Sequence, residues 1–293
     1  MFSWYIIFYI FLAGTAAGAF LCGIVVNAVT GLESLLKPGV RSLRADGAGF
    51  LVAAVCFPLA CIFLFCDIGR PANLLYVLQN PLASLVSAGA WIMMLSTLVS
   101  MALAFLMLTN RLRQTGAWAL MGMGGVLSVA TLVYTGLLLS TIPSVDFWTT
   151  PALVALFIMS GLTCGVAATS VLGVALEGSW RRDSALAKVR NACAVAELAA
   201  LVWLLVDRLF ATASARASVL RLVQGDLSAV FVGGVVLVGL VVPFACSALR
   251  RVADARAMTL AAGGCTLLGG LALRYAIVAA AVVEAVAFGP LFA

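Results

Sequence analysis

Long apolar stretches follow one another along almost the whole chain, and short polar segments separate them. A helix needs roughly 20 mostly apolar residues to cross the hydrocarbon core of a bilayer, which is about 30 Å thick. Eight stretches reach this length, at residues 4–29, 48–66, 83–109, 117–142, 151–176, 191–213, 228–248 and 258–288. The pattern predicts an all-α, polytopic membrane protein of eight transmembrane helices, with no room left for a soluble domain.

Composition agrees with this prediction. Hydrophobic residues make up 65% of the chain and charged residues 10%, and the mean hydropathy is +1.19. A soluble domain usually has about 45–50% apolar and about 25% charged residues. The net charge of +6 comes from basic residues in short loops, so it does not indicate a nucleic-acid partner. The expected surroundings are a lipid bilayer.

Positive charge is concentrated in alternate loops. Twelve Lys and Arg residues lie in the loops after the first, third, fifth and seventh predicted helices, and four lie in the other loops. Cytoplasmic loops carry an excess of Lys and Arg. We therefore expect the odd-numbered loops in the cytoplasm and both termini outside.

A small-residue motif, G-x-x-x-G, occurs at residues 14–18 and again at 161–165, half a chain length later. One copy only indicates that two helices approach closely. Two copies in the same apolar frame indicate a duplication, and four helices per repeat would leave both halves in one orientation. We expect two four-helix bundles, at residues 1–142 and 143–293, with the binding site in the first.

Several classes of redox centre are excluded. The protein has no histidine, and transmembrane b-type haem is held by histidines on facing helices. Its eight cysteines lie in apolar segments without a C-x-x-C spacing, where cysteine behaves as a small hydrophobic residue. We expect no haem, no iron–sulfur cluster and no metal site in this protein.

Polar side chains within apolar helices are costly, so each is a candidate for function. Each helical residue adds about 1.5 Å of depth from the predicted outer surface. Five side chains fall at a similar depth in the outer leaflet: Tyr9, Asp67, Arg70, Tyr134 and Arg274. We expect a binding site where they converge.

Two of these residues also have a structural interpretation. Tyr9 could belong to the interfacial aromatic belt with Trp4 and Tyr5. Arg274 could extend its charged end toward the outer surface while its stem stays in lipid. Tyr134 is too deep for the belt, and its buried hydroxyl needs a partner.

Two acidic residues are candidates for a proton path. Glu197 lies in the inner half of the sixth predicted helix, and Glu284 reaches the outer interface. A structural pairing of Glu197 with Arg190 is the alternative. Asp67 and Arg70 could likewise form an ion pair that fixes a helix end.

Six segments, taken in order, carry a resemblance to one family. They are Phe8–Gly18, Asp67–Pro71, Tyr134–Gly136, Phe147–Pro151, Phe157–Gly165 and Gly269–Tyr275. Together they resemble the NrfD/polysulfide-reductase membrane subunit family, with the DMSO-reductase anchor subunits as more distant relatives.

The resemblance implies a haem-free subunit of a respiratory oxidoreductase in a bacterial or archaeal cytoplasmic membrane. Menaquinone or ubiquinone would be its bound substrate, near the outer face. A four-cluster ferredoxin-like iron–sulfur subunit would dock on that face, with a molybdopterin catalytic subunit or a multihaem cytochrome beyond it. Tyr134 matches the family's quinone-contacting tyrosine, and Arg274 or Arg70 would stabilise an anionic form of the quinone.

One departure from the family concerns the start of the first helix. Some members place histidine and asparagine there as quinone contacts, and this protein has Ser3, Trp4 and Tyr5. The quinone must be held differently. Two other functions stay open: a secondary transporter with parallel four-helix repeats, and a redox-silent membrane anchor.

Overall fold

The protein was analysed as a computed structural model that describes residues 4–30, 47–68, 84–177, 180–249 and 254–281. The described residues form helices joined by turns, without a strand among them. Eight helical segments are long and apolar enough to cross a membrane, which confirms the predicted all-α membrane architecture. The main helices are α1 (Trp4–Thr30), α4 (Ala48–Ile68), α6 (Leu85–Leu108), α7 (Gln114–Ser140), α8 (Pro151–Glu177), α9 (Trp180–Leu209), the π-helix η2 (Ala229–Val241) continued by α11 (Val242–Leu249), and α12 (Ala255–Ala279).

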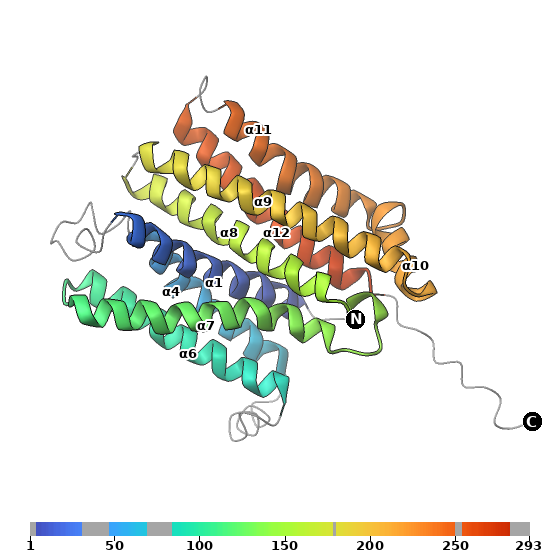
Figure 1. The fold of residues 1–293 in the computed structure, drawn as a ribbon, viewed down its shortest axis with the longest axis horizontal. Helices are drawn as coiled ribbons and strands as arrows, with labels where there is room; N and C mark the ends of the chain where they lie inside the picture. The colour runs from blue at the N-terminus through green and yellow to red at the C-terminus, as the bar shows by residue number, and fades with distance from the viewer. Residues whose placement is uncertain (1–3, 31–46, 69–83, 178–179, 250–253, 282–293) are drawn as a thin grey trace, which may run out of the picture.

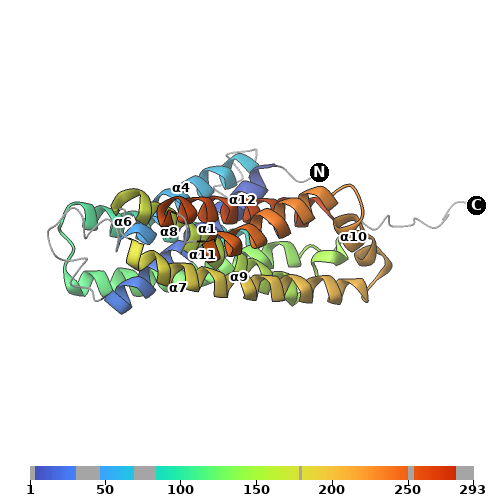
Figure 2. The same ribbon diagram turned by 90° about the horizontal axis from the view of Figure 1, so that it is seen from above.

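The helices lie side by side along one direction (Figures 1 and 2). The blue-to-green helices α1, α4, α6 and α7 lie on one side, and the yellow-to-red helices α8, α9, α11 and α12 lie on the other. In the middle, α1 packs against α4, α7, α8 and α12, while α8 packs against α1, α7, α9 and α12. Any site near the centre of the molecule is therefore built on α1 or α8.

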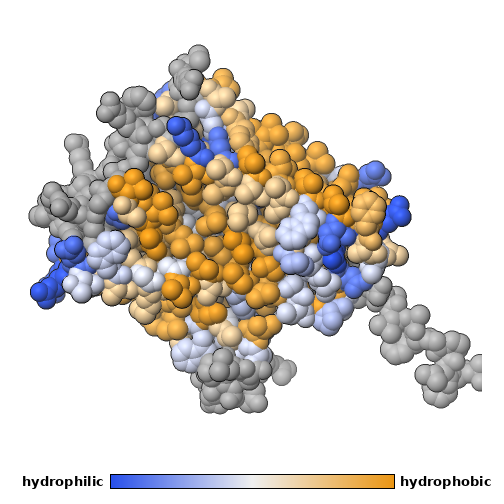
Figure 3. Space-filling view, in the orientation of Figure 1, coloured by the Kyte–Doolittle hydropathy of each residue, from blue (hydrophilic) through white to orange (hydrophobic). Residues whose placement is uncertain are grey.

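The two ends of the bundle differ. One end, which we call the α10 end, holds the start of α1 and the short helix α10 (Ala213–Val223) (Figure 1). At the opposite end, which we call the Arg113 end, α6 finishes and α7 begins. The middle of the face shown in Figure 3 is largely hydrophobic, and hydrophilic residues gather toward its ends. This distribution suits a bilayer, in which only the ends of the bundle meet water.

Helix boundaries differ from the prediction in three places. Helix α9 begins at Trp180 instead of residue 191, because a charged segment that no apolar window includes is helical as well. Helix α12 ends at Ala279, short of the predicted residue 288. Helix α10 was not predicted, because its 11 residues are too few for an apolar window of membrane-spanning length.

The two G-x-x-x-G motifs face each other where α1 crosses α8. A Cβ atom added to Gly18 would lie 2.8 Å from the carbonyl carbon of Gly161, and one added to Gly161 would lie 3.2 Å from the Gly14 carbonyl oxygen. Only glycine lets the two backbones approach this closely. The two motifs thus form a contact between the first and second halves of the chain. The origin of the two halves by duplication stays a prediction, and so does the location of both termini outside.

Replacing Gly18 by alanine is expected to destabilise the protein by about 1–3 kcal/mol, because the new methyl group would overlap the α8 backbone. The matched control is Gly173→Ala on α8, where an added Cβ meets nothing within 4 Å. Alanine there should be neutral or stabilising, since glycine is the poorer helix former. Thermal unfolding of the detergent-purified variants measures both. Equal midpoints for the two variants would contradict the close contact of α1 with α8.

Candidate functional site

Two tyrosines from different helices meet inside the first group of helices. Tyr9 of α1 is fully buried and Tyr134 of α7 is 4% exposed. Tyr9 lies about 8 Å from the start of α1, and Tyr134 about 9 Å from the end of α7, at 1.5 Å per residue. Both are therefore near the α10 end. Trp4 and Tyr5, by contrast, are exposed, so they fit the aromatic belt and Tyr9 does not.

A glycine on α6 makes room for the Tyr134 ring. A Cβ atom added to Gly89 would overlap the ring and hydroxyl of Tyr134, so the ring lies directly against the α6 backbone. On its other side, the Tyr134 side chain interacts with that of Tyr9. The ring is thus held between α6 and α1.

The Tyr9 hydroxyl faces Tyr134 and Cys61, yet it meets no group at hydrogen-bonding geometry among the described residues. A buried polar group without a partner costs about 1–3 kcal/mol, so this hydroxyl suits a bound acceptor. Nearby polar side chains on different helices also pair: the Cys61 thiol lies 3.3 Å from the Thr97 hydroxyl, and the Ser96 hydroxyl lies 3.4 Å from that of Thr131.

Arg274 of α12 is buried where α1, α8 and α12 meet. Its Nη1 atom donates to Ser160 Oγ at 2.8 Å and to the Gly270 carbonyl oxygen at 2.9 Å. The rings of Phe11 and Phe157 flank the guanidinium, each with its centroid 5.6 Å from Cζ. The side chain is 1% exposed, which excludes the interpretation that it extends to the surface.

Gly14 gives the guanidinium its space. A Cβ atom added to Gly14 would lie 3.0 Å from Nη2 of Arg274. The first glycine of the α1 motif therefore has two neighbours, the α8 backbone and this cation. The Nε atom of Arg274 meets no acceptor among the described residues.

Glu197 of α9 is the carboxylate that interacts with this cation. It is 7% exposed, and its carboxyl group interacts with the side chains of Ser160 and Thr163 as well as with Arg274. Ser160 accordingly lies between the acid and the base. Arg190, the alternative structural partner of Glu197, donates to Ser247 Oγ at 2.6 Å.

This arrangement differs from the grouping expected from the sequence, in which Arg274 lay with Tyr134 and Glu197 lay apart. Side chains on a helix tilt toward its N-terminus, so the guanidinium turns back to the level of Gly270. Gly270 lies about 13 Å before the end of α12, so the guanidinium is farther from the α10 end than the Arg274 backbone is. The structure therefore shows two clusters. One is the tyrosine pair (Tyr9, Tyr134). The other, which we call the buried charge pair, is Glu197 and Arg274, whose side chains share Ser160 as a neighbour and are not within salt-bridge distance of each other.

The other predicted site residues lie near the α10 end or beyond the described residues. Asp67 stands at the end of α4 and is partly exposed. Arg70 and Glu284 lie outside the described residues, so the proposed Asp67–Arg70 pair and the role of Glu284 stay predictions. Within the described part of the chain, no group of three His, Cys, Asp or Glu residues could hold a metal ion.

A polar network at the α10 end was not foreseen. Asp207 accepts hydrogen bonds from Thr150 at 2.8 Å and from Arg208 at 2.7 Å, and Arg208 also donates to the Asp146 carbonyl oxygen at 2.8 Å. The Trp148 indole donates to the Ile277 carbonyl oxygen at 3.1 Å. These bonds fix the segment between α7 and α8, including the 3-10 helix η1 (Asp146–Trp148), against α9 and α12. The signal in the sequence that could have indicated this network is the F-W-T-T-P motif at residues 147–151, which supplies Trp148 and Thr150.

Comparison with known proteins gives two findings. The profile of the family described as "Polysulphide reductase, NrfD" matches residues 1–287. The protein is also similar to the C subunit of polysulfide reductase from Wolinella succinogenes, with 28% identity over 194 residues. That match covers 60% of this protein and 59% of the relative, so it spans about three fifths of the relative's length.

Proposed function

We propose that this protein, which belongs to the NrfD polysulphide reductase family, is the membrane subunit of a respiratory oxidoreductase that binds menaquinone or ubiquinone. The tyrosine pair would hold the quinone near the α10 end. A quinone supplies the redox chemistry itself, and the protein supplies binding, orientation and electrostatics. The relative's name, a subunit of polysulfide reductase, supports a place in a redox complex.

The observation that carries this proposal is the unpartnered hydroxyl of Tyr9. It is fully buried, its interaction with the Tyr134 side chain falls outside hydrogen-bond geometry, and it makes no hydrogen bond to another residue in the described part of the chain. A quinone offers two carbonyl oxygens, each of which accepts a hydrogen bond from a hydroxyl donor. Two tyrosines can thus supply what histidine and asparagine supply in some relatives.

The buried charge pair would serve proton movement beside this site. Glu197 is the one fully or nearly buried carboxylate among the described residues, and intramembrane acids commonly mark proton relays. Its neighbours Ser160 and Thr163 have hydroxyls that can pass a proton, while Arg274 offsets its charge. Glu284 stays a further candidate. Arg274 does not contact Tyr9 or Tyr134 in the geometry described above. Its positive charge would act on the tyrosine pair at a distance, across α1.

The partners follow from the family and belong to the same proposal. A four-cluster ferredoxin-like iron–sulfur subunit would dock at the α10 end and take electrons from the quinol. A molybdopterin catalytic subunit or a multihaem cytochrome would lie beyond it. Loop charge supports this side as the outer face of a bacterial or archaeal cytoplasmic membrane.

Titration with a quinol analogue tests the proposal and separates it from a redox-silent anchor. Tyr9→Phe should weaken binding by about three- to tenfold, because one hydrogen bond contributes about 0.5–1.5 kcal/mol. Tyr275→Phe is the matched control, since it removes a hydroxyl at the same end while keeping the ring that stacks on Trp4. Isothermal titration of the purified protein gives both constants. No binding by the wild-type protein would favour the redox-silent anchor.

A further inference from the structure

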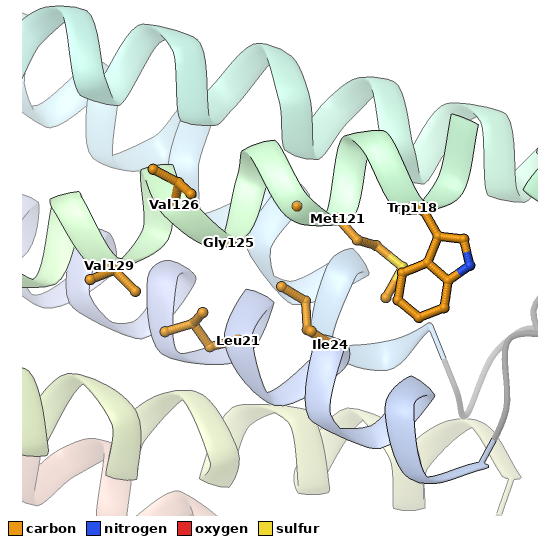
Figure 4. A pocket seen from close by; sticks show the side chains of 8 residues that line it. Leu21, Ile24, Trp118, Met121, Gly125, Val126 and Val129 are labelled. Carbon is orange, nitrogen blue, oxygen red and sulfur yellow. The ribbon is translucent and has the colours of Figure 1, made fainter. Parts of the chain in front are cut away.

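A groove of about 450 Å³ runs between α1 and α7 toward the Arg113 end (Figure 4). Its lining is apolar apart from one indole nitrogen and consists of Leu21, Ile24, Trp118, Met121, Gly122, Gly125, Val126 and Val129. A Cβ atom added to Gly122 would meet nothing within 4 Å. Part of the groove therefore exists because α7 has glycine, without a side chain, at residues 122 and 125 of its lining.

The length of the groove matches one leaflet of a bilayer. Trp118 and Val129, its outermost members on α7, are eleven residues apart, or about 16 Å along the helix. This is about half the thickness of the hydrocarbon core. An extended acyl chain of one leaflet occupies the same depth.

A second hollow, of about 460 Å³, lies at the turn between α6 and α7, at the same end of the bundle as the groove. It is lined by Leu106, Arg111, Leu112, Arg113, Thr115 and Gly116. Both arginines are exposed, and no carboxylate is part of the lining. Thr115 of the basic hollow lies about one helical turn before Trp118 of the apolar groove, so residues of the two linings are neighbours on α7.

We propose that the hollow and the groove together bind one anionic phospholipid. Arg111 and Arg113 would bind the phosphodiester, because the planar guanidinium matches phosphate oxygens in geometry and charge. One acyl chain would fill the groove between Trp118 and Val129. Basic pockets beside transmembrane helices attract anionic headgroups in this way.

The isoprenoid tail of a quinone fits this surface less well. The Tyr134 ring lies against Gly89 of α6 and is not part of the groove lining, which ends on α7 at Val129, five residues before Tyr134. The groove instead opens between α7 and α1. A quinone is also uncharged, so it would give the two arginines no anion to bind.

Native mass spectrometry of the detergent-purified full-length protein tests the proposal with phosphatidylglycerol and phosphatidylcholine as probes. The wild-type protein should retain phosphatidylglycerol in preference to phosphatidylcholine. Gly122→Leu, which fills the groove without a clash, should lower that retention at least about threefold, the loss expected when one or two buried methylene groups are displaced. Gly264→Leu on α12 is the matched control, because a Cβ there also meets nothing within 4 Å, and it should retain the lipid.

A second variant does not depend on the groove. Arg111→Ala combined with Arg113→Ala should reduce the preference for phosphatidylglycerol by about fivefold per arginine. Both residues are exposed in a turn, so the fold should persist. The proposal is overturned if this preference survives in the double variant, if Gly122→Leu behaves like Gly264→Leu, or if a long-tailed quinone displaces the retained lipid.

Discussion

Replacing Arg274 by methionine is expected to lower the stability of the protein by about 1.5–3 kcal/mol, the usual contribution of a hydrogen bond made by a charged group. The reason is that Ser160 and the Gly270 carbonyl would lose the donor that lies 2.8 Å and 2.9 Å from their oxygens, and the buried Glu197 would lose a nearby positive charge. Thermal unfolding in detergent, followed by circular dichroism, measures the loss. Arg274→Lys should recover part of it, since lysine keeps the charge but not the planar fork.

The double variant Arg274→Met with Glu197→Gln separates the pair from simple packing. Removing both charges should be less costly than the sum of the single changes, because neither group is left uncompensated. Arg216→Met on the exposed face of α10 is the control and should change stability by less than about 0.5 kcal/mol. Additive losses in the double variant would show that Glu197 and Arg274 do not act as a pair.

The eight helices could be predicted because a segment spans the membrane when the mean hydropathy of about 20 consecutive residues is high. That quantity depends only on the local sequence. The same reasoning places a backbone position at a depth along its helix, as it did for Tyr9 and Tyr134. It says nothing about the direction in which a side chain leaves the helix. Arg274 shows the consequence, since its guanidinium turns back to the level of Gly270 and joins Glu197.

Neighbours on other helices could not be predicted for the same reason. Nothing in the sequence marks Gly89 as the residue on which the Tyr134 ring rests, because the contact depends on how α6 and α7 are rotated about their axes. The motifs at residues 14–18 and 161–165 carried more information. Small residues at that spacing indicate a close contact, and the contact they form is with each other.

The separation of the tyrosine pair from the buried charge pair bears on the proposed mechanism. The two clusters lie against different parts of α1: Arg274 of α12 contacts Gly14 and Phe11, whereas Tyr9 of α1 faces Tyr134 of α7. A cation held behind a helix still lowers the energy of negative charge nearby in a medium of low dielectric constant. Electron transfer at the tyrosine pair and protonation of Glu197 would then be coupled through α1.

Replacing Tyr134 by phenylalanine is expected to lower quinol oxidation by at least about tenfold while leaving assembly intact. The ring would still rest on Gly89, so only the hydroxyl is lost. Positioned groups that transfer protons commonly contribute about 10²–10⁴-fold to a rate, and the remaining Tyr9 hydroxyl offsets part of that loss. The measurement is quinol turnover by the assembled complex in membranes, normalised to the amount of this subunit.

Gly89→Ala supplies an independent change at the same place, because the added methyl group would displace the Tyr134 ring without removing its hydroxyl. It should lower turnover in the same direction as Tyr134→Phe. Gly173→Ala on α8 is its matched control, since an added Cβ there meets nothing within 4 Å, and it should turn over like the wild type. Wild-type turnover by both Tyr134→Phe and Gly89→Ala would mean that the quinone is held elsewhere. A loss in Gly89→Ala alone would point to the shape of the site and not to the hydroxyl.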